Sequence, residues 1–263
     1  MGSPDVGAVV QVVGYETVPA GETDHAALLL ASDGAVTRES LAPGTELQYR
    51  LDGRHCAGDV TEGEHTPCDN EASPYCDRHT SRWACARCTG ECDLPLPSCR
   101  EEHAVYLAAF APATFKVGVT RSWRLDTRLR EQGADRAAHL RTVEDGRIAR
   151  QIEAEIADNV GDRVRVPAKI RGLHLPVDED AWAALLAAHD HRETFRFEYG
   201  LDLAERPMAE TLASGTVRGT KGRVLVLDRA GSSYAVDLRD LLGYELADGG
   251  TERALQSSFA AFE

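Results

Sequence analysis

Lysine is nearly absent from the 263-residue sequence: only three of its 29 basic residues are lysines, Lys116, Lys169 and Lys221. Acidic residues number 43, so the formal net charge is −14. This composition is typical of the salt-adapted proteins of halophilic archaea, although a GC-rich genome with an acidic bias would give a similar one. The net charge does not exclude a nucleic-acid partner, because at high salt binding rests on local arginines and geometry.

Long apolar runs are also missing. No run approaches the roughly 20 residues that a membrane-spanning helix needs. The first residues, MGSPDVGAVV, lack a basic segment followed by an apolar one. We therefore expect no signal peptide, no membrane partner and a cytoplasmic location. Hydrophobic residues make up 43% of the sequence, as in ordinary globular proteins of one or two domains, and no pattern indicates an oligomeric state.

Cysteine is absent outside the stretch from Cys56 to Cys99, which holds all seven cysteines. Such clustering in a cytoplasmic protein favours metal binding over disulfides. Cys76-x-x-His79 and Cys85-x-x-Cys88 are two close pairs with the spacing of tetrahedral zinc sites. With one histidine, the cysteines supply eight candidate zinc ligands: Cys56, Cys68, Cys76, His79, Cys85, Cys88, Cys92 and Cys99.

Eight ligands predict two closed, structural zinc sites, since a catalytic zinc keeps one position open for water. The simplest division is sequential, with the first four ligands on one ion and the last four on the other; an interleaved division is also open. Two other interpretations remain: one zinc with unpaired cysteines, or an iron–sulfur cluster on the last four cysteines. His55, His65 and His103 lie nearby without a close partner, and we expect them to be solvated or to support the ligands.

The pattern of residues divides the chain into four segments: 1–52, 53–102, 103–165 and 166–263. The first predicts short strands, at VGAVVQVVGYETV, AALLLAS and ELQYRL. The second is rich in Cys, Pro and Gly with little periodicity, as expected of a fold organised by metal. The last predicts one helix, DEDAWAALLAAH, and strands at FRFEYGL, TVRG, GRVLVLD and SYAVDL, a β-rich unit that the N-terminal strands would complete.

The third segment has a clear order of elements. HAVYLAAF and FKVGVT predict a hairpin, and residues 123–132 predict a helix that Gly133 ends. HLRTV predicts a third strand, and GRIARQIEAEIAD a helix with isoleucines spaced by four. The expected fold class is therefore α+β, with a ββαβα core.

This core resembles the GIY-YIG nuclease superfamily, whose first strand carries Gly-Ile-Tyr and whose second carries Tyr-Ile-Gly. AVY at 104–106 keeps the tyrosine, and KVG at 116–118 keeps the glycine. Lysine replaces the second tyrosine, as in some branches of the superfamily. The resemblance places the superfamily's catalytic arginine and metal-binding glutamate, each carried on a helix, at Arg128 and Glu153.

A wider stretch, residues 50–165, resembles the uncharacterised zinc-containing family named domain of unknown function 2797. The matching segments are PYCDRH, CARCTGEC, HAVYLAAF, KVGVTR and REQGADRAA, and more loosely GTKGRVLVLD and DLLGYEL. The two resemblances imply a two-zinc Cys/His module before a GIY-YIG-like core, with β-rich segments on either side.

The resemblance implies a nuclease that acts on DNA or RNA with one Mg²⁺. Such chemistry needs a proton acceptor, a cation for the charged transition state and an acidic metal ligand. Tyr106 is the candidate base, if a neighbouring cation lowers its pKa from about 10. Lys116 is placed to lower that pKa or to hold phosphate, Arg128 to clamp a phosphate oxygen, and Glu153 to hold Mg²⁺.

Three functions remain open at this point. The first is the Mg²⁺-dependent nuclease. The second is a catalytically inactive module that binds nucleic acid or protein, in which Arg128 and Glu153 are only solvated charges on helix faces. The third is a small-molecule-binding or regulatory protein whose pocket lies in the β-rich ends.

Overall fold

A computed structural model of the chain describes residues 9–17, 25–80, 90 and 97–251. Its contacts divide the chain into two compact units, which we call the first unit (residues 1–81 and 207–263) and the second unit (residues 82–206). Both combine strands with helices, so the predicted α+β class is confirmed at this level, with strands predominating. Among the described helices, none is long and apolar enough to cross a membrane.

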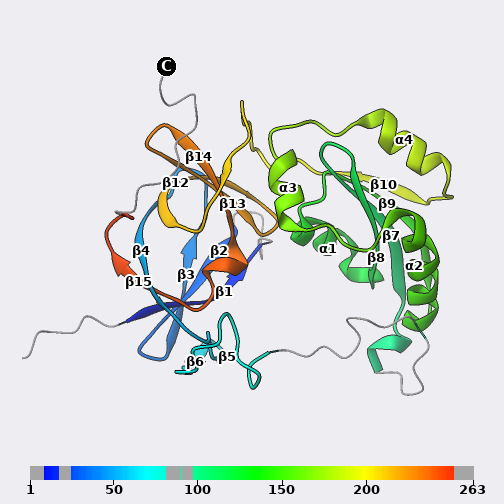
Figure 1. The fold of residues 1–263 in the computed structure, drawn as a ribbon. Helices are drawn as coiled ribbons and strands as arrows, with labels where there is room; N and C mark the ends of the chain where they lie inside the picture. The colour runs from blue at the N-terminus through cyan, green and yellow to red at the C-terminus, as the bar shows by residue number, and fades with distance from the viewer. Residues whose placement is uncertain (1–8, 18–24, 81–89, 91–96, 252–263) are drawn as a thin grey trace, which may run out of the picture. The chain divides into compact units, whose positions relative to one another are not determined.

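The first unit is built on an 11-stranded sheet in the order β11-β14-β13-β12-β4-β15-β1-β2-β3-β6-β5. The N-terminal strands therefore complete the C-terminal β-rich region, as the sequence predicted (Figure 1). The elements are β1 (Val10–Glu16), β2 (Ala27–Ser32), β3 (Ala35–Ser40), β4 (Glu46–Arg54), β5 (Asp59–Thr61), β6 (Glu64–Thr66), β11 (Met208–Ala209), β12 (Ala213–Lys221), β13 (Val224–Arg229), β14 (Ser232–Asp237), α5 (Leu238–Leu241) and β15 (Tyr244–Asp248).

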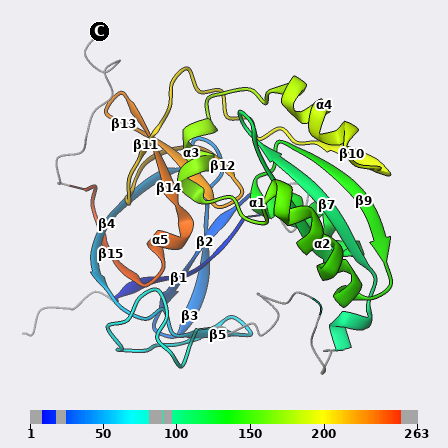
Figure 2. The ribbon, with the colours of Figure 1, turned by 45° about the vertical axis from the view of Figure 1, so that its right-hand side comes forward.

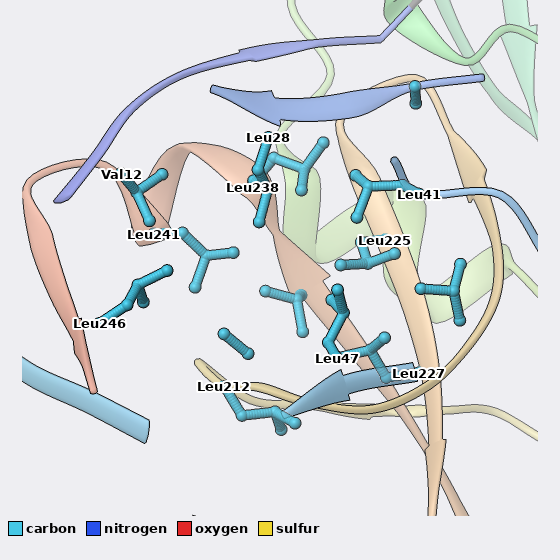
Figure 3. Packing of buried hydrophobic residues seen from close by; sticks show 14 of the residues in the cluster. Val12, Leu28, Leu41, Leu47, Leu212, Leu225, Leu227, Leu238, Leu241 and Leu246 are labelled. Carbon is cyan, nitrogen blue, oxygen red and sulfur yellow. The ribbon is translucent and has the colours of Figure 1, made fainter. Parts of the chain in front are cut away.

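One apolar core holds this sheet together. Figure 3 shows Val12 of β1, Leu47 of β4 and Leu227 of β13 gathered in it with leucines of α5. Three other strands separate β13 from β1 in the sheet order, yet both contribute to this core, so the sheet curls around it. Leucines of α5 fill the space that the strands enclose, and burying such side chains contributes about 1.5–3 kcal/mol each.

The second unit carries a 4-stranded antiparallel sheet in the order β10-β9-β7-β8. Its central strand β7 is buried along almost its whole length, because helices cover both faces of the sheet. The elements are η2 (Pro97–Arg100), β7 (His103–Phe110), β8 (Thr114–Arg121), η3 (Ser122–Arg124), α1 (Leu125–Gln132), β9 (Arg136–Val143), α2 (Gly146–Val160), α3 (Val166–Gly172), α4 (Glu179–Ala187) and β10 (Glu193–Arg196).

The two helices α1 and α2 pack on opposite faces of this sheet. Leu125 and Leu129 of α1 contact the face that carries Tyr106. Ala149 of α2 contacts the face that carries Val105, and Figure 2 shows α2 lying alongside β7 and β9. Helix α1 ends at Gly133, whose φ of 68° is left-handed, and Asp145 caps α2 by accepting a hydrogen bond from the Arg147 amide.

The order strand, strand, helix, strand, helix matches the order predicted for residues 103–165. The second unit also takes in α3, α4 and β10, which pairs with β9. Its extent therefore differs from the predicted segment 103–165, because β10 gains its hydrogen-bond partner from a strand that lies about fifty residues earlier in the chain.

Candidate functional site

Four predicted zinc ligands come together in the first unit. We call Cys56, Cys68, Cys76 and His79 the Cys/His cluster, since their ligand atoms all lie within 4.8 Å of one another. His79 Nδ1 is 3.3 Å from both Cys56 Sγ and Cys76 Sγ, and Cys68 Sγ is 4.0 Å from Cys76 Sγ. Two thiolates on one tetrahedral zinc are about 3.8 Å apart, given Zn–S bonds of about 2.3 Å. The cluster can therefore hold one ion such as zinc.

Polar side chains around the cluster fix the backbone of its ligands. The buried Gln11 donates hydrogen bonds to the carbonyl oxygens of Cys56 and Gly243, at 3.3 and 3.1 Å. His55 Nδ1 lies 2.9 Å from the Cys68 carbonyl oxygen, and His65 Nε2 lies 3.0 Å from that of Ala57. These two histidines support the ligands and do not join them, as expected. A support of this kind orients ligands before an ion binds.

The thiols of the cluster differ in acidity. Burial raises the pKa of the Cys56 thiol. Burial acts in the same direction on Cys76, but the amides of His79 and Arg78 and the neighbouring ligands outweigh it and lower the pKa of Cys76 to about 6. Since the thiolate is the form that binds metal, Cys76 is ready to bind near neutral pH.

The second predicted zinc site cannot be assembled from the described residues, because Cys85, Cys88 and Cys92 lie outside them. Cys99 lies in η2 and is partly exposed. Helix η2 contacts α2, and Gly90 lies so close to α2 that a Cβ there would be 2.4 Å from the Arg147 carbonyl oxygen. Gly90 and η2 therefore both contact α2, the helix that carries Glu153.

The predicted catalytic tyrosine is placed by a glycine on the neighbouring strand. Tyr106 and Gly118 face each other across β7 and β8, and β8 is the edge strand of its sheet. A Cβ on Gly118 would lie 2.4 Å from the Tyr106 hydroxyl oxygen and 2.5 Å from its Cζ. The tyrosine ring therefore crosses the space that a side chain would occupy. Only glycine at 118 lets the hydroxyl reach the edge of the sheet.

All four predicted catalytic residues line one cavity of about 480 Å³, which we call the basic cavity. Lys116 lies two residues before Gly118 and shares its face of the sheet. Arg128 comes from α1, and Glu153 comes from α2. Six basic side chains and two carboxylates line the cavity: Lys116, Arg121, Arg124, Arg128, Arg150, Arg163, Glu153 and Asp162.

This local excess of positive charge contrasts with the net charge of the chain, −14. A concave surface with one sign of charge attracts ligands of the other sign, and low-dielectric walls strengthen the effect. The basic cavity is therefore suited to an anion such as a phosphate group.

The surroundings of Lys116 lower the pKa of its ammonium group. Burial, and the positive charges of Arg128 and Arg150, lower its pKa to about 8, although Glu153 and Asp162 act in the opposite direction. A group with a pKa of about 8 exchanges protons readily near neutral pH.

Tyr106 does not meet the condition that the sequence-based role set for it. Burial raises the pKa of its hydroxyl, and this effect outweighs the lowering by Arg128 and by Gln132. The amide of Gln132 donates a hydrogen bond of 2.6 Å to the Tyr106 oxygen. The condition for Tyr106 as a base, a hydroxyl pKa lowered by a neighbouring cation, is therefore not met, since desolvation in the sheet interior dominates over the nearby cations.

Glu153 already has a partner. Its carboxylate lies 2.6 Å from the guanidinium of Arg150, and only 13% of its side chain is exposed. Arg128 lies 3.0 Å from Glu131, whose other carboxylate oxygen accepts a hydrogen bond of 2.7 Å from Arg124. Glu153 and Arg128 therefore both line the cavity as members of ion pairs. A bound cation would have to replace Arg150 at Glu153, and a bound anion would have to replace Glu131 at Arg128.

Several residues of the cavity were missed from the sequence. Arg150 lies one helical turn before Glu153, a spacing that could have signalled the pair. Asp162 and Arg163 follow Gly161, whose carbonyl accepts a hydrogen bond from the Val117 amide of β8. That contact between distant segments brings Asp162 and Arg163 to the cavity, and no pattern in the local sequence predicts it.

A second cavity, of about 680 Å³, lies in the first unit beside the Cys/His cluster. Its walls include Tyr15, Tyr75, His79 and Arg239. It corresponds in place to the pocket expected in the β-rich ends, but its walls lack the concentration of basic side chains that distinguishes the basic cavity.

These observations define the class of the protein: a mixed α+β protein with a Cys/His cluster able to hold a metal ion and a separate basic cavity. The chain belongs to the family described as "Protein of unknown function (DUF2797)", which matches residues 53–246. The match includes the Cys/His cluster and the basic cavity, and it confirms the family resemblance seen in the sequence. No curated protein and no solved structure matches the chain.

Proposed function

We propose that the protein is a zinc-stabilised, GIY-YIG-like nuclease that hydrolyses a phosphodiester of DNA or RNA with Mg²⁺ in the basic cavity. One observation carries the proposal: Tyr106, Lys116, Arg128 and Glu153, drawn from two strands and two helices, line the same cavity. The fit between Tyr106 and Gly118 supports it further, because it gives a physical reason for a tyrosine on one strand and a glycine on its partner.

Each residue has a role that its surroundings support. Glu153 would hold one Mg²⁺, an ion that prefers few carboxylates and several waters. Arg128 donates hydrogen bonds to a non-bridging phosphate oxygen and stabilises the charge that develops on the phosphoryl group. Displacement of Arg150 from Glu153 by Mg²⁺ would free a second guanidinium for the phosphate.

The proton of the attacking water passes to the neutral amine form of Lys116, which a pKa of about 8 makes available near neutral pH. The Tyr106 hydroxyl, with its raised pKa, acts between them as a relay that gives one proton while it takes another. The water oxygen forms the new bond to phosphorus as the bond to the leaving nucleotide oxygen breaks, and no redox partner is needed.

Zinc has no part in this reaction. We propose two structural ions, one on the Cys/His cluster and one on Cys85, Cys88, Cys92 and Cys99. The first stabilises the loops beside the large sheet. The second would stabilise the segment that ends in η2, which contacts α2, and so would help to position Glu153.

A cleavage assay at high salt tests the proposal. Single- and double-stranded DNA and RNA are incubated with the protein and Mg²⁺, and parallel samples contain no added Mg²⁺. We expect cleavage that needs Mg²⁺ and that Glu153→Gln lowers at least about 100-fold, the usual cost of losing a group that stabilises a transition state. Glu155→Gln is the matched control, since Glu155 lies on the same helix and is exposed.

A second function is favoured by one specific observation, the pairing of Glu153 with Arg150 at 2.6 Å. If that pair does not open, the carboxylate is not available to Mg²⁺, and the cavity binds nucleic acid without cutting it. Electrophoretic shifts without cleavage would support this inactive binding module. Cleavage unaltered in Glu153→Gln would remove Glu153 from the mechanism.

A further inference from the structure

Trp123 stands at the mouth of the basic cavity with 68% of its surface exposed, more than any other large hydrophobic side chain among the described residues. It lies in η3, the short turn that joins β8 to α1. Leaving an aromatic ring in water forgoes the gain from burial, about 25 cal/mol for each Å² of apolar surface. The exposed ring is therefore available to contact a ligand of the basic cavity.

Two arginines flank the ring. The guanidinium carbons of Arg121 and Arg124 are each 5.9 Å from the ring centroid, and both residues also line the basic cavity. The indole nitrogen of Trp123 lies 3.5 Å from Glu101, which is also 3.5 Å from Arg121. The ring is thus held loosely in place, with two cations 5.9 Å from its centre.

An exposed aromatic ring beside cations of the same cavity fits one ligand chemistry well. A nucleobase stacks on an aromatic ring whatever its sequence, while the phosphates on either side of it bind arginines. In a double helix the bases stack on one another and offer no face to a protein surface. A base can reach Trp123 only if it is unpaired.

We propose that Trp123 is a stacking platform for an unpaired base next to the phosphate in the basic cavity, and that the preferred substrate is single-stranded nucleic acid. The inference rests on the proposed function for the identity of the cavity as a phosphate site. It goes beyond that function because it names the strand state of the substrate and the residue that selects it.

Binding measured with no added Mg²⁺ tests the inference without cleavage. Fluorescent single-stranded DNA, single-stranded RNA and duplex DNA of one length are titrated with the full chain at one fixed salt concentration. We expect tighter binding of the single strands, and a loss of about tenfold to a hundredfold in Trp123→Ala, the usual effect of removing one stacking partner. Duplex binding should change by less than about twofold, because it depends on phosphate contacts.

Two variants serve as controls. Trp123→Phe keeps an aromatic face and should keep most of the affinity for single strands. Ile148→Ala removes an apolar side chain of the same unit that is 49% exposed and does not line the cavity, and it should leave binding unchanged. Whichever of DNA and RNA binds more tightly identifies the sugar, and either result supports the platform.

Failure of this inference can be told apart from failure of the proposed function. If Mg²⁺-dependent cleavage occurs but Trp123→Ala binds single strands as well as the unaltered protein does, the platform is wrong and the nuclease stands. If no cleavage occurs but single-strand binding still depends on Trp123, the stacking platform is supported and the protein is a binding module without nuclease activity. Equal losses for single strands and duplex, or no binding to either, overturn the platform.

Discussion

At the scale of single residues, the basic cavity depends on a glycine as much as on the charged side chains that line it. Gly118 leaves the space through which the Tyr106 ring passes, and Gln132 then fixes the hydroxyl with a hydrogen bond of 2.6 Å. Lys116 shares this face and loses part of its hydration. Two predictions follow from these contacts.

Gly118→Ala places a methyl group 2.4 Å from the Tyr106 hydroxyl oxygen, so the ring has to leave its position. We expect a stability loss of about 1–3 kcal/mol, the usual cost of overpacking a core, and a large loss of cleavage. Urea denaturation and the cleavage assay measure the two effects. Gly53→Ala is the matched control in a strand, since its nearest neighbour is the end of the Glu245 side chain at 3.3 Å. Equal behaviour of the two variants would contradict the account of Tyr106.

Lys116→Met tests the lowered pKa. The folded protein binds the lysine proton with a pKa of about 8, against the ordinary 10.5 in the unfolded chain. Between these values the unfolded state holds more protons, so the free energy of unfolding of the unaltered protein rises with pH. Below pH 8 the variant should be more stable by up to about 3 kcal/mol, because it has no charge to bury. The difference should shrink from pH 8 upward and vanish above pH 10.5, and a difference independent of pH would refute it.

At the scale of elements, local patterns gave the core of the second unit correctly. The β7–β8 hairpin, α1 with its stop at Gly133, and α2 follow from apolar spacing within each segment. The sequence missed α3, α5 and β15. Each is short, and β15 gains its hydrogen bonds from β1 and β4, which lie about two hundred residues earlier. A pattern read within a few residues cannot show such pairing.

Part of the lining of the basic cavity could also be named from the sequence. The four cavity residues could be named because a family resemblance fixed their places in the order of elements. The Arg150 partner of Glu153 and the Gln132 partner of Tyr106 could not, since both contacts depend on how side chains of separate elements pack. Whether the pKa of Tyr106 is lowered could not be predicted for the same reason: burial is a property of the folded sheet.

Gly90 tests whether the cysteine-rich stretch supports α2. Gly90→Ala adds a Cβ 2.4 Å from the Arg147 carbonyl oxygen at a φ of +89°. Gly44 has the same φ with nothing within 4 Å of its would-be Cβ, so Gly44→Ala isolates the backbone strain. We expect about 1–2 kcal/mol lost in Gly44→Ala, and about 1–3 kcal/mol more in Gly90→Ala, with weaker cleavage only in the latter. Thermal denaturation and cleavage that do not separate the two variants would contradict the support.

At the scale of the whole molecule, the two units draw on different parts of the chain. Strands from both ends of the sequence form the sheet of the first unit, and the Cys/His cluster lies in the same unit. The basic cavity lies wholly in the second unit. The proposed zinc ions therefore stabilise the two units separately.

Metal content tests that arrangement. Protein purified without chelator should hold about two zinc ions per chain, and Cys76→Ser and Cys88→Ser should each reduce this to about one. Each loss should lower the unfolding temperature, because the binding energy of a structural zinc contributes to folding. Elemental analysis and calorimetry give the two results. About one zinc in the unaltered protein, or iron in place of zinc, would contradict the two-ion prediction.

The central claim is that the basic cavity cleaves phosphodiesters, and the most direct test compares two arginines of α1. Arg128 lines the cavity, whereas Arg130 pairs with Asp126 at 2.7 Å and lies over the Phe197 ring. The single-turnover rate of Mg²⁺-dependent cleavage is measured with protein in excess for Arg128→Ala and Arg130→Ala. The account predicts a loss of at least about 100-fold for Arg128→Ala and less than about threefold for Arg130→Ala. Equal rates in the two variants, or cleavage as fast as in the unaltered protein, would contradict it.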